Sequence, residues 1–374
     1  MAGIYLHIPF CKQACHYCNF HFATSLRQKK EMVQAILREI ELQAHYLEGE
    51  PLNSIYIGGG TPSLLDVEEL NAIFHQIQNF HHIQKDAEIT LEANPDDLQA
   101  AYLNELARTS VNRLSIGIQS FAEVDLKFMN RAHNAAEAAK CVHLAKAAGF
   151  HNLTIDLIYG SPTTSNEIWQ QNIQQALDLG VQHLSCYCLT VEPQTALEHF
   201  VKKGKVQAVD DDKANEQFEI LMTELEANGF VHYEISNFAK AGFFAQHNSN
   251  YWLGVPYLGI GPSAHSFNGK SRQWNIAHNT KYLKALAKDE VPYEREVLDT
   301  EQRYNEYVLT RLRTIWGCER STILAFGEPY WRHFQREISV FLKKGTVVKD
   351  GEVYRLSRSG KMMADGIAME LFWG

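Results

Sequence analysis

The sequence is short of positive charge and of long apolar runs. Its 374 residues contain 35 Lys and Arg against 44 Asp and Glu, a formal net charge of −9. Proteins that bind nucleic acid need a basic surface to displace counterions from the phosphates, so we expect no nucleic-acid partner. No segment approaches the roughly 20 apolar residues that a membrane span requires, and the first residues lack the pattern of a secretory signal. We therefore expect a cytoplasmic protein without a membrane span, for which peripheral membrane contact and a homodimer stay open.

The sequence also lacks a disulfide framework. It has seven cysteines, and an odd number in an intracellular chain of this size does not indicate a set of structural disulfides. Three of the seven lie close together: Cys11, Cys15 and Cys18. The other four are scattered and are expected to be small buried side chains: Cys141, Cys186, Cys188 and Cys318.

The three clustered cysteines have the spacing Cys-x3-Cys-x2-Cys and directly follow a short apolar segment. Three thiolates can hold three irons of a four-iron cubane and leave the fourth iron with an open coordination position. The amine and carboxylate of S-adenosylmethionine (SAM) fit that position. Cys11, Cys15 and Cys18 are therefore predicted to bind a [4Fe–4S] cluster. A structural zinc site completed by His16 or His21 is the alternative with a metal, and three unligated buried cysteines are the alternative without one.

Strand and helix patterns alternate through the first half of the chain. Short apolar segments are predicted to be strands at residues 4–8, 54–57, 88–92, 114–117, 153–157 and 183–188. Longer amphipathic segments are predicted to be helices near residues 27–46, 66–78, 97–109, 134–148 and 167–179. Strands separated by helices form a parallel sheet through right-handed crossovers. The predicted fold class is therefore α/β, with a partial, TIM-like (β/α)6 barrel.

The unusual polar and glycine-rich residues fall just after these strands, where parallel barrels carry their chemistry. The cysteine triplet follows the first strand, and residues 58–62 (Gly-Gly-Gly-Thr-Pro) follow the second. Glu92, Gln119 and Asp156 lie at the ends of the next three strands. We expect all of them on one rim. The triple glycine lets backbone groups approach a ligand, although a tight turn after the strand would also explain it.

The pattern changes after about residue 205. We predict three parts: a barrel at 1–205, a connecting region at 206–290 and a C-terminal domain at 291–374. The connecting region begins with a helix near 212–228 and continues into a stretch rich in glycine and aromatic residues at 242–274. The C-terminal domain has two or three helical segments followed by two short strands about Asp350 and Gly351, a typical hairpin turn. This order predicts a winged-helix-like α+β domain.

Several segments resemble the HemN-like family of oxygen-independent coproporphyrinogen III dehydrogenases, which are radical SAM proteins. The likeness covers essentially the whole chain and rests on the cysteine triplet and on residues 3–11 (GIYLHIPFC), 58–62 (GGGTP), 92–95 (EANP), 113–121 (RLSIGIQSF) and 155–160 (IDLIYG). The resemblance implies a radical SAM fold with a [4Fe–4S] cluster and with SAM bound to that cluster.

The resemblance also implies roles for individual residues. The SAM on the cluster would be contacted by Tyr5, Gly59 and Glu92, and Tyr17 would pack near its adenine. Positions that hold a second SAM in the dehydrogenase are matched here by Gly60, Thr61, Gln119, Arg131 and Asp156. The number of SAM molecules stays open.

Three departures from the dehydrogenase favour its relatives, the haem chaperones called HemW. The dehydrogenase has a further cysteine two residues after the triplet, where this sequence has Phe20. It also has a long segment before the tyrosine that corresponds to Tyr5. Finally, residues 247–252 (HNSNYW) match the HNxxYW motif of the chaperones. The resemblance thus implies a chaperone that binds haem and passes it to apo-haemoproteins, without catalytic residues. The alternatives are radical SAM decarboxylation of coproporphyrinogen III and, third, radical SAM chemistry on another substrate.

His247, the first residue of that motif, is the candidate haem ligand. A neutral imidazole is a good axial ligand of haem iron. Aromatic side chains that can stack on a porphyrin face lie on both sides of it: Phe243, Phe244, Tyr251 and Trp252. His265 is a second candidate. A hydrogen-bonded histidine of the core is the alternative for both positions.

Overall fold

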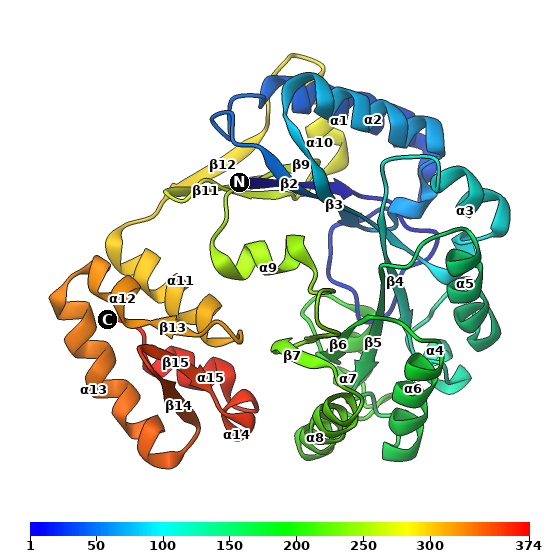
Figure 1. The fold of residues 1–374 in the computed structure, drawn as a ribbon. Helices are drawn as coiled ribbons and strands as arrows, with labels where there is room; N and C mark the ends of the chain where they lie inside the picture. Colours follow the sequence, from blue (N-terminus) through cyan, green and yellow to red (C-terminus); the bar gives the residue numbers. More distant parts are fainter.

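The computed structural model describes residues 1–374, the whole chain. A large curved sheet carries helices on its outer face, and a smaller C-terminal unit lies beside it (Figure 1). No helix combines the length and the apolar character needed to cross a membrane.

All six predicted strands are present, and they are parallel neighbours in chain order. They are β1 (Ala2–Ile8), β2 (Leu52–Gly59), β3 (Ile83–Ala93), β4 (Arg113–Gln119), β5 (Leu153–Tyr159) and β6 (His183–Cys188). The five predicted helices are confirmed as α1 (Lys29–Leu42), α2 (Val67–Phe80), α3 (Ala100–Leu106), α5 (Ala135–Ala147) and α6 (Asn166–Asp178). The helices α1, α3 and α5 are shorter than predicted, α2 ends two residues later, and α6 is shifted by one residue. The short helix α4 (Glu123–Phe128) was not predicted. This arrangement confirms the α/β class and the partial (β/α)6 barrel.

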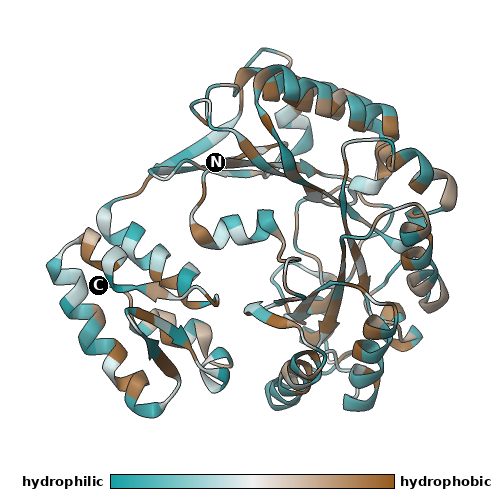
Figure 2. Cartoon of the chain, viewed as in Figure 1, coloured by the Kyte–Doolittle hydropathy of each residue, from teal (hydrophilic) through white to brown (hydrophobic).

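The strands separate an apolar layer from a polar interior, because successive side chains of a strand point to opposite faces of a sheet. On β2, for example, Ile55 and Ile57 are fully buried in a core cluster of 56 residues that the outer helices complete. Between them, Tyr56 points into the barrel. Hydrophobic residues accordingly gather along the strands and the inner faces of the helices (Figure 2). The interior of the barrel is therefore left to polar side chains.

The sheet has twelve strands rather than six and remains open. Beyond β1 it continues through β9 (Tyr257–Ile260), β10 (His265–Phe267), β11 (Ser271–Asn275) and β12 (Tyr293–Val297), and beyond β6 through β8 (Asn237–Ala239) and β7 (Val231–Glu234). Only β9 of these is parallel to its barrel neighbour, β1. The helices of this part are α7 (Ala196–Lys202), α8 (Asp211–Ala227), α9 (Gln246–Leu253) and α10 (Asn279–Leu286). The helix predicted near 212–228 is thus confirmed as α8.

The C-terminal unit has its own core of 15 buried residues, between Tyr304 and Leu371. Its elements are α11 (Thr300–Leu312), β13 (Cys318–Glu319), α12 (Arg320–Phe326), α13 (Glu328–Lys344), β14 (Val347–Asp350), β15 (Val353–Leu356), α14 (Arg358–Lys361) and α15 (Ala364–Glu370). The predicted hairpin is confirmed, and β13 adds a third antiparallel strand to it. The order of helices and strands up to β15 is winged-helix-like. The exact domain boundaries at 205 and 290 stay a prediction.

Candidate functional site

The loop that carries the three cysteines closes back onto the end of β1. The backbone N–H of Cys11 donates to the carbonyl of Ala23, and that of Ala23 donates to the carbonyl of Pro9. The middle of the loop is held by the segment after α4, where Asn130 donates to the carbonyl of Ala14 at 2.7 Å. All three cysteines are half-buried and unpaired. The loop is therefore fixed at the C-terminal rim of the barrel, as predicted.

The two histidines that the zinc alternative requires have other partners. His16 Nδ1 lies 2.9 Å from the carbonyl of Phe128, and His21 Nε2 lies 2.7 Å from the side-chain oxygen of Asn279. No three His, Cys, Asp or Glu side chains lie close enough together to hold a single metal ion. The donor set on this loop is therefore three thiols, which suits a cluster better than one tetrahedral ion.

Arg131 lies beside the cysteines with only neutral partners. Its guanidinium donates to Cys15 Sγ at 3.2 Å, to the side-chain oxygen of Asn94 at 2.8 Å and to the carbonyl of Gly117 at 2.7 Å. Its buried Nε has no hydrogen-bond partner. Asp96 is near enough to stabilise this charge but makes no ion pair with it. Burying a cation without an ion-pair partner is costly, so this position suits a negatively charged group next to Cys15.

Tyr17 and the glycine run are both packed against protein. Tyr17 contacts a small apolar cluster around Met129 and Leu197. A side chain at Gly59, whose φ is +107°, would place a Cβ 2.7 Å from a ring atom of His7. A Cβ at Gly60 would lie 2.5 Å from the carbonyl oxygen of Phe10. The tight turn alone therefore explains why glycine is needed here, with or without a ligand.

Thr61 and Gln119 complete the rim. Thr61 is buried and accepts a hydrogen bond from Asn94, the residue that also binds Arg131. Gln119 has a φ of +68° at an irregularity in the pairing of β4 with β5. A non-glycine residue in this region of backbone space is strained, and such strain is frequent at functional sites.

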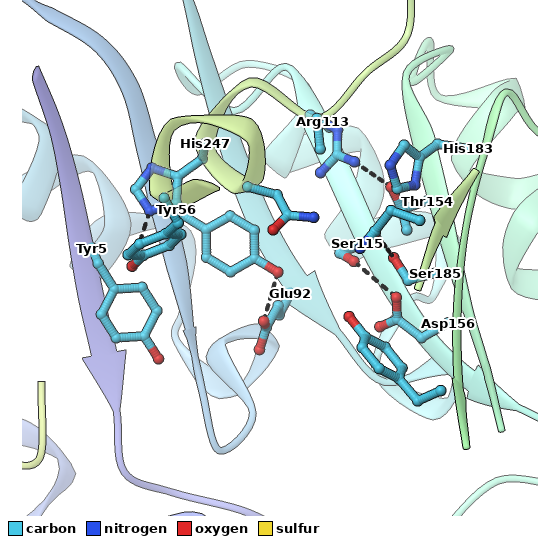
Figure 3. Close-up of a pocket in the computed structure, with 15 residues that line it drawn as sticks. Tyr5, Tyr56, Glu92, Arg113, Ser115, Thr154, Asp156, His183, Ser185 and His247 are labelled. Carbon is cyan, nitrogen blue, oxygen red and sulfur yellow. Dashed lines mark hydrogen bonds between the residues drawn. The ribbon is translucent and has the colours of Figure 1, made fainter. Parts of the chain in front are cut away.

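An inner cavity of about 220 Å³ lies within the barrel. The strands line it with Tyr5, Tyr56, Glu92, Arg113, Ser115, Thr154, Asp156, His183, Ser185 and Tyr187, and the connecting region adds Asn237, Ala245, His247, Asn248 and Tyr251 (Figure 3). This volume is below the roughly 300–1,000 Å³ of typical ligand pockets. The cavity therefore suits a small polar group rather than a whole macrocycle.

Two carboxylates dominate this inner cavity. Glu92 accepts from the hydroxyl of Tyr56 at 2.6 Å and from the backbone N–H of Gly59 at 3.2 Å. Burial raises the pKa of Glu92 to about 7, and the charge of Asp156 adds to this shift. Burial likewise raises the pKa of Asp156 to about 6. Both groups are therefore poised to hold or accept a proton near neutral pH.

Helix α9 closes the other end of the barrel and carries His247. The backbone N–H groups of Gln246 and His247 both donate to Glu88 at 2.9 Å. The His247 ring is 3% exposed, its Nδ1 lies 2.9 Å from Ser54 Oγ, and it stacks on Tyr56 with ring centroids 5.2 Å apart. Burial lowers its pKa to about 3. In this structure His247 is a packed, neutral side chain in the wall of the inner cavity.

An outer cavity of about 520 Å³ lies next to the inner one and shares Tyr5, Glu92 and Tyr251 with it. Its remaining lining is His7, Asn19, Phe20, His21, Gly59, Tyr257, Ser263 and His265. It thus joins the end of the cysteine loop to β9 and β10. Phe20 is 67% exposed in it.

The predicted site residues thus fall into three groups. The cysteines, Tyr17, Gly60, Thr61, Gln119 and Arg131 surround the loop on the rim. Tyr5, Gly59 and Glu92 line the outer cavity, while Asp156 and His247 line the inner one together with Tyr5 and Glu92.

Most residues that line the inner cavity were not predicted from the sequence, among them Arg113, His183 and Tyr187. The strand sequences did contain a signal for this polar lining. Parallel strands covered on both faces are usually apolar throughout, whereas these strands alternate, as in His183, Ser185 and Tyr187 on β6.

Comparisons with known proteins agree with this geometry. The model of the radical SAM superfamily matches residues 5–176. The heme chaperone HemW of Bacillus subtilis is 33% identical over 98% of both chains, and that of Escherichia coli is 32% identical over 99% of this chain and 97% of its own. A mouse protein, radical S-adenosyl methionine domain-containing protein 1, mitochondrial, is 30% identical over 99% of this chain and 87% of its own.

The fold has a solved counterpart as well. Coproporphyrinogen III oxidase (HemN) of E. coli superposes with a TM-score of 0.86 over 99% of this chain and 90% of its own, at 21% identity. This match shows that the fold is shared.

Proposed function

The chain belongs to the HemW family of the radical SAM superfamily, and from this membership we propose that it is a haem chaperone, which binds haem and passes it to apo-haemoproteins. The observation that carries the proposal is the similarity to proteins named heme chaperone over nearly the full length of both chains. The alignments cover 98% and 97% of those two relatives, so nearly their whole length has a counterpart here. We place this activity in the cytoplasm, with haem and apo-haemoproteins as partners.

We propose that Cys11, Cys15 and Cys18 hold a [4Fe–4S] cluster. The support is chemical: three unpaired thiols on one fixed loop, nearby histidines that are hydrogen-bonded elsewhere, and the cation of Arg131 in contact with Cys15. A cluster held by three thiolates is negatively charged, and Arg131 would offset that charge. When bound, the cluster would supply an electron to SAM or assist haem transfer.

SAM would lie against the outer cavity, where Tyr5, Gly59 and Glu92 meet. There the Glu92 carboxylate would accept hydrogen bonds from the ligand, and its raised pKa would let it take up a proton when no ligand is present. Tyr17 would pack near the adenine. If a second SAM binds, its contacts would be Gly60, Thr61, Gln119, Arg131 and Asp156.

Phe20 argues for the chaperone and against the decarboxylase. It occupies the position where the dehydrogenase has a further cysteine, and its apolar ring is exposed in the outer cavity. We therefore expect no conversion of coproporphyrinogen III when the cluster-loaded protein is given SAM and a reductant. Product formation faster than about 0.1 s⁻¹, the low end of enzyme turnover, would instead establish the oxidative decarboxylase.

The direct test is haem transfer. The cluster-loaded protein is titrated with ferric haem, repurified, and mixed with apomyoglobin, whose spectrum changes when it takes up haem. We expect one-way transfer that is faster than from an equal concentration of haem on serum albumin. A protein that binds no haem, or releases it no faster than albumin, would contradict the proposal.

The expectation that His247 ligates the haem iron stays a prediction. Because its ring is buried between Ser54 and Tyr56, iron could reach it only after α9 moved away from the barrel.

A further inference from the structure

The most accessible imidazole of the outer cavity belongs to His265. It is exposed, and no hydrogen bond from the protein affects its ring; only burial and the nearby Arg272 lower its pKa. The other two histidines of this cavity differ. His7 lies between Tyr5 and a backbone carbonyl, and His21 is bound to Asn279. His265 therefore has ring nitrogens that are free to bind a metal, in the neutral form that ligation requires.

The surroundings of His265 suit a porphyrin. The ring of Trp274 stacks beside it, with centroids 6.2 Å apart and an interplanar angle of 29°. Phe20 and Tyr257 add aromatic surface on other walls of the cavity. Aromatic faces of this kind bury large apolar area. The volume of about 520 Å³ falls within the range of ligand pockets, unlike that of the inner cavity.

The backbone holds His265 in place. It pairs with Trp274 across β10 and β11, and its carbonyl would collide with any side chain at Gly259. The turn before it is anchored by Glu39 of α1, a fully buried carboxylate that accepts from the N–H of Gly261 at 2.8 Å. A ligand on so rigid a support needs little reorganisation when metal binds.

We propose that His265 is the axial ligand of the haem iron and that the porphyrin lies in the mouth of the outer cavity, between Phe20 and Tyr257. This inference rests on the proposed chaperone function and names its cargo site. Arg272 is close enough to influence the His265 ring, although its guanidinium is already ion-paired with Glu306. Gly59 and Glu92, the proposed SAM contacts, line the same cavity. Haem on His265 would therefore lie over the mouth of the cavity, beside Phe20 at the end of the cysteine loop, and SAM would occupy the interior.

The test uses the full-length, cluster-loaded protein, ferric haem and three variants. His265→Ala is expected to bind haem at least about 10-fold more weakly, since even indirect changes at metal sites cost that much, and to lose the absorption and EPR spectrum of nitrogen-ligated haem. Because the His265 side chain is exposed, its removal leaves no buried group unpaired. Added free imidazole should restore the spectrum of this variant. The matched control is His143→Ala, which removes an exposed imidazole from α5, away from the cavity.

The third variant, His247→Gln, separates the two candidate ligands. A wild-type spectrum and affinity in His265→Ala would overturn the proposal, as would a loss of nitrogen ligation in His247→Gln alone. A wild-type protein that binds no haem would overturn both this inference and the chaperone function. If the wild-type protein binds and transfers haem and His265→Ala does so with the same affinity and spectrum, only the ligand assignment is overturned and the chaperone function stands.

Discussion

Replacing Glu92 by Gln should stabilise the ligand-free protein at pH 8 and leave its stability almost unchanged at pH 5. Glu92 lies in the wall between the two cavities, and burial raises its pKa from 4.5 to about 7. The folded protein therefore holds a proton that the unfolded chain releases above pH 4.5. Folding stability falls as the pH rises from about 4.5 to about 7, because the buried carboxylate must then be charged.

The size of the effect follows from the pKa. At about 1.36 kcal/mol per pH unit, charging Glu92 costs at most about 3 kcal/mol above pH 7. That is an upper limit, since the carboxylate faces a cavity that admits water. For a chain of 374 residues that unfolds as one unit, it corresponds to up to about 4 °C in Tm. Glu92→Gln carries no charge and keeps an oxygen for the hydroxyl of Tyr56, so it should recover much of this stability at pH 8 and almost none at pH 5.

The assay is the melting temperature of the ligand-free protein and of Glu92→Gln at pH 5 and pH 8. Glu68→Gln, an exposed substitution on α2, is the control and should show no such difference. The same Glu92→Gln protein should bind SAM more weakly, because a charged acceptor is lost. Equal melting temperatures for wild type and Glu92→Gln at both pH values would refute the reasoning that the charged form of Glu92 is destabilised by burial.

Two further predictions concern the cysteine loop and the support of His265. Anaerobically purified protein should contain about four iron and four sulfide per chain, and Cys11→Ala, Cys15→Ala or Cys18→Ala should each lose most of the brown absorbance; a triple variant that kept its iron would contradict the cluster. Glu39→Ala should lower the free energy of unfolding by about 3 kcal/mol or more in urea titrations, since it leaves the buried donors of Gly261, Gln43 and Asn275 unpaired. Glu41→Ala removes only a surface ion pair with Arg38 from the same helix and should cost under about 1 kcal/mol; equal losses for the two variants would show that Glu39 anchors nothing.

The barrel and its rim could be predicted because their signals are local. Each barrel strand is a short apolar segment beside an amphipathic helix, and a parallel sheet places all strand ends on one rim. The cysteine loop and Glu92 could therefore be placed at the strand ends without any knowledge of tertiary contacts. The rim position predicted for Asp156 is wrong, because β5 continues to Tyr159 and Asp156 lies in the wall of the inner cavity. The strands β9 to β12 have only three to five residues each, which is too short for periodicity to reveal them.

The relative accessibility of the two histidines could not be predicted, because it depends on contacts between distant segments. The neighbours of His247 are Ser54 and Tyr56, almost two hundred positions earlier in the chain. Nothing in residues 247–252 indicates that this helix closes the barrel. The free nitrogens of His265 likewise reflect the absence of partners from other elements, a property that no short motif encodes.

His247 and the turn before His265 lie at different levels along the barrel. His247 lies against Gly3, near the start of β1, whereas the turn before His265 lies against the backbone of His7, near the end of that strand. Four residues of a strand separate these levels, about 13 Å at 3.3 Å per residue. Helix α9 faces the C-terminal unit at the first level, where Trp252 lies under the guanidinium of Arg313 at 5.4 Å. A haem on His265 would therefore sit on the side of the cysteine loop, whereas Trp252, at the other end of the 247–252 motif, connects α9 to the C-terminal unit. In the proposed arrangement, the 247–252 motif would be structural and the turn before His265 would support the haem ligand.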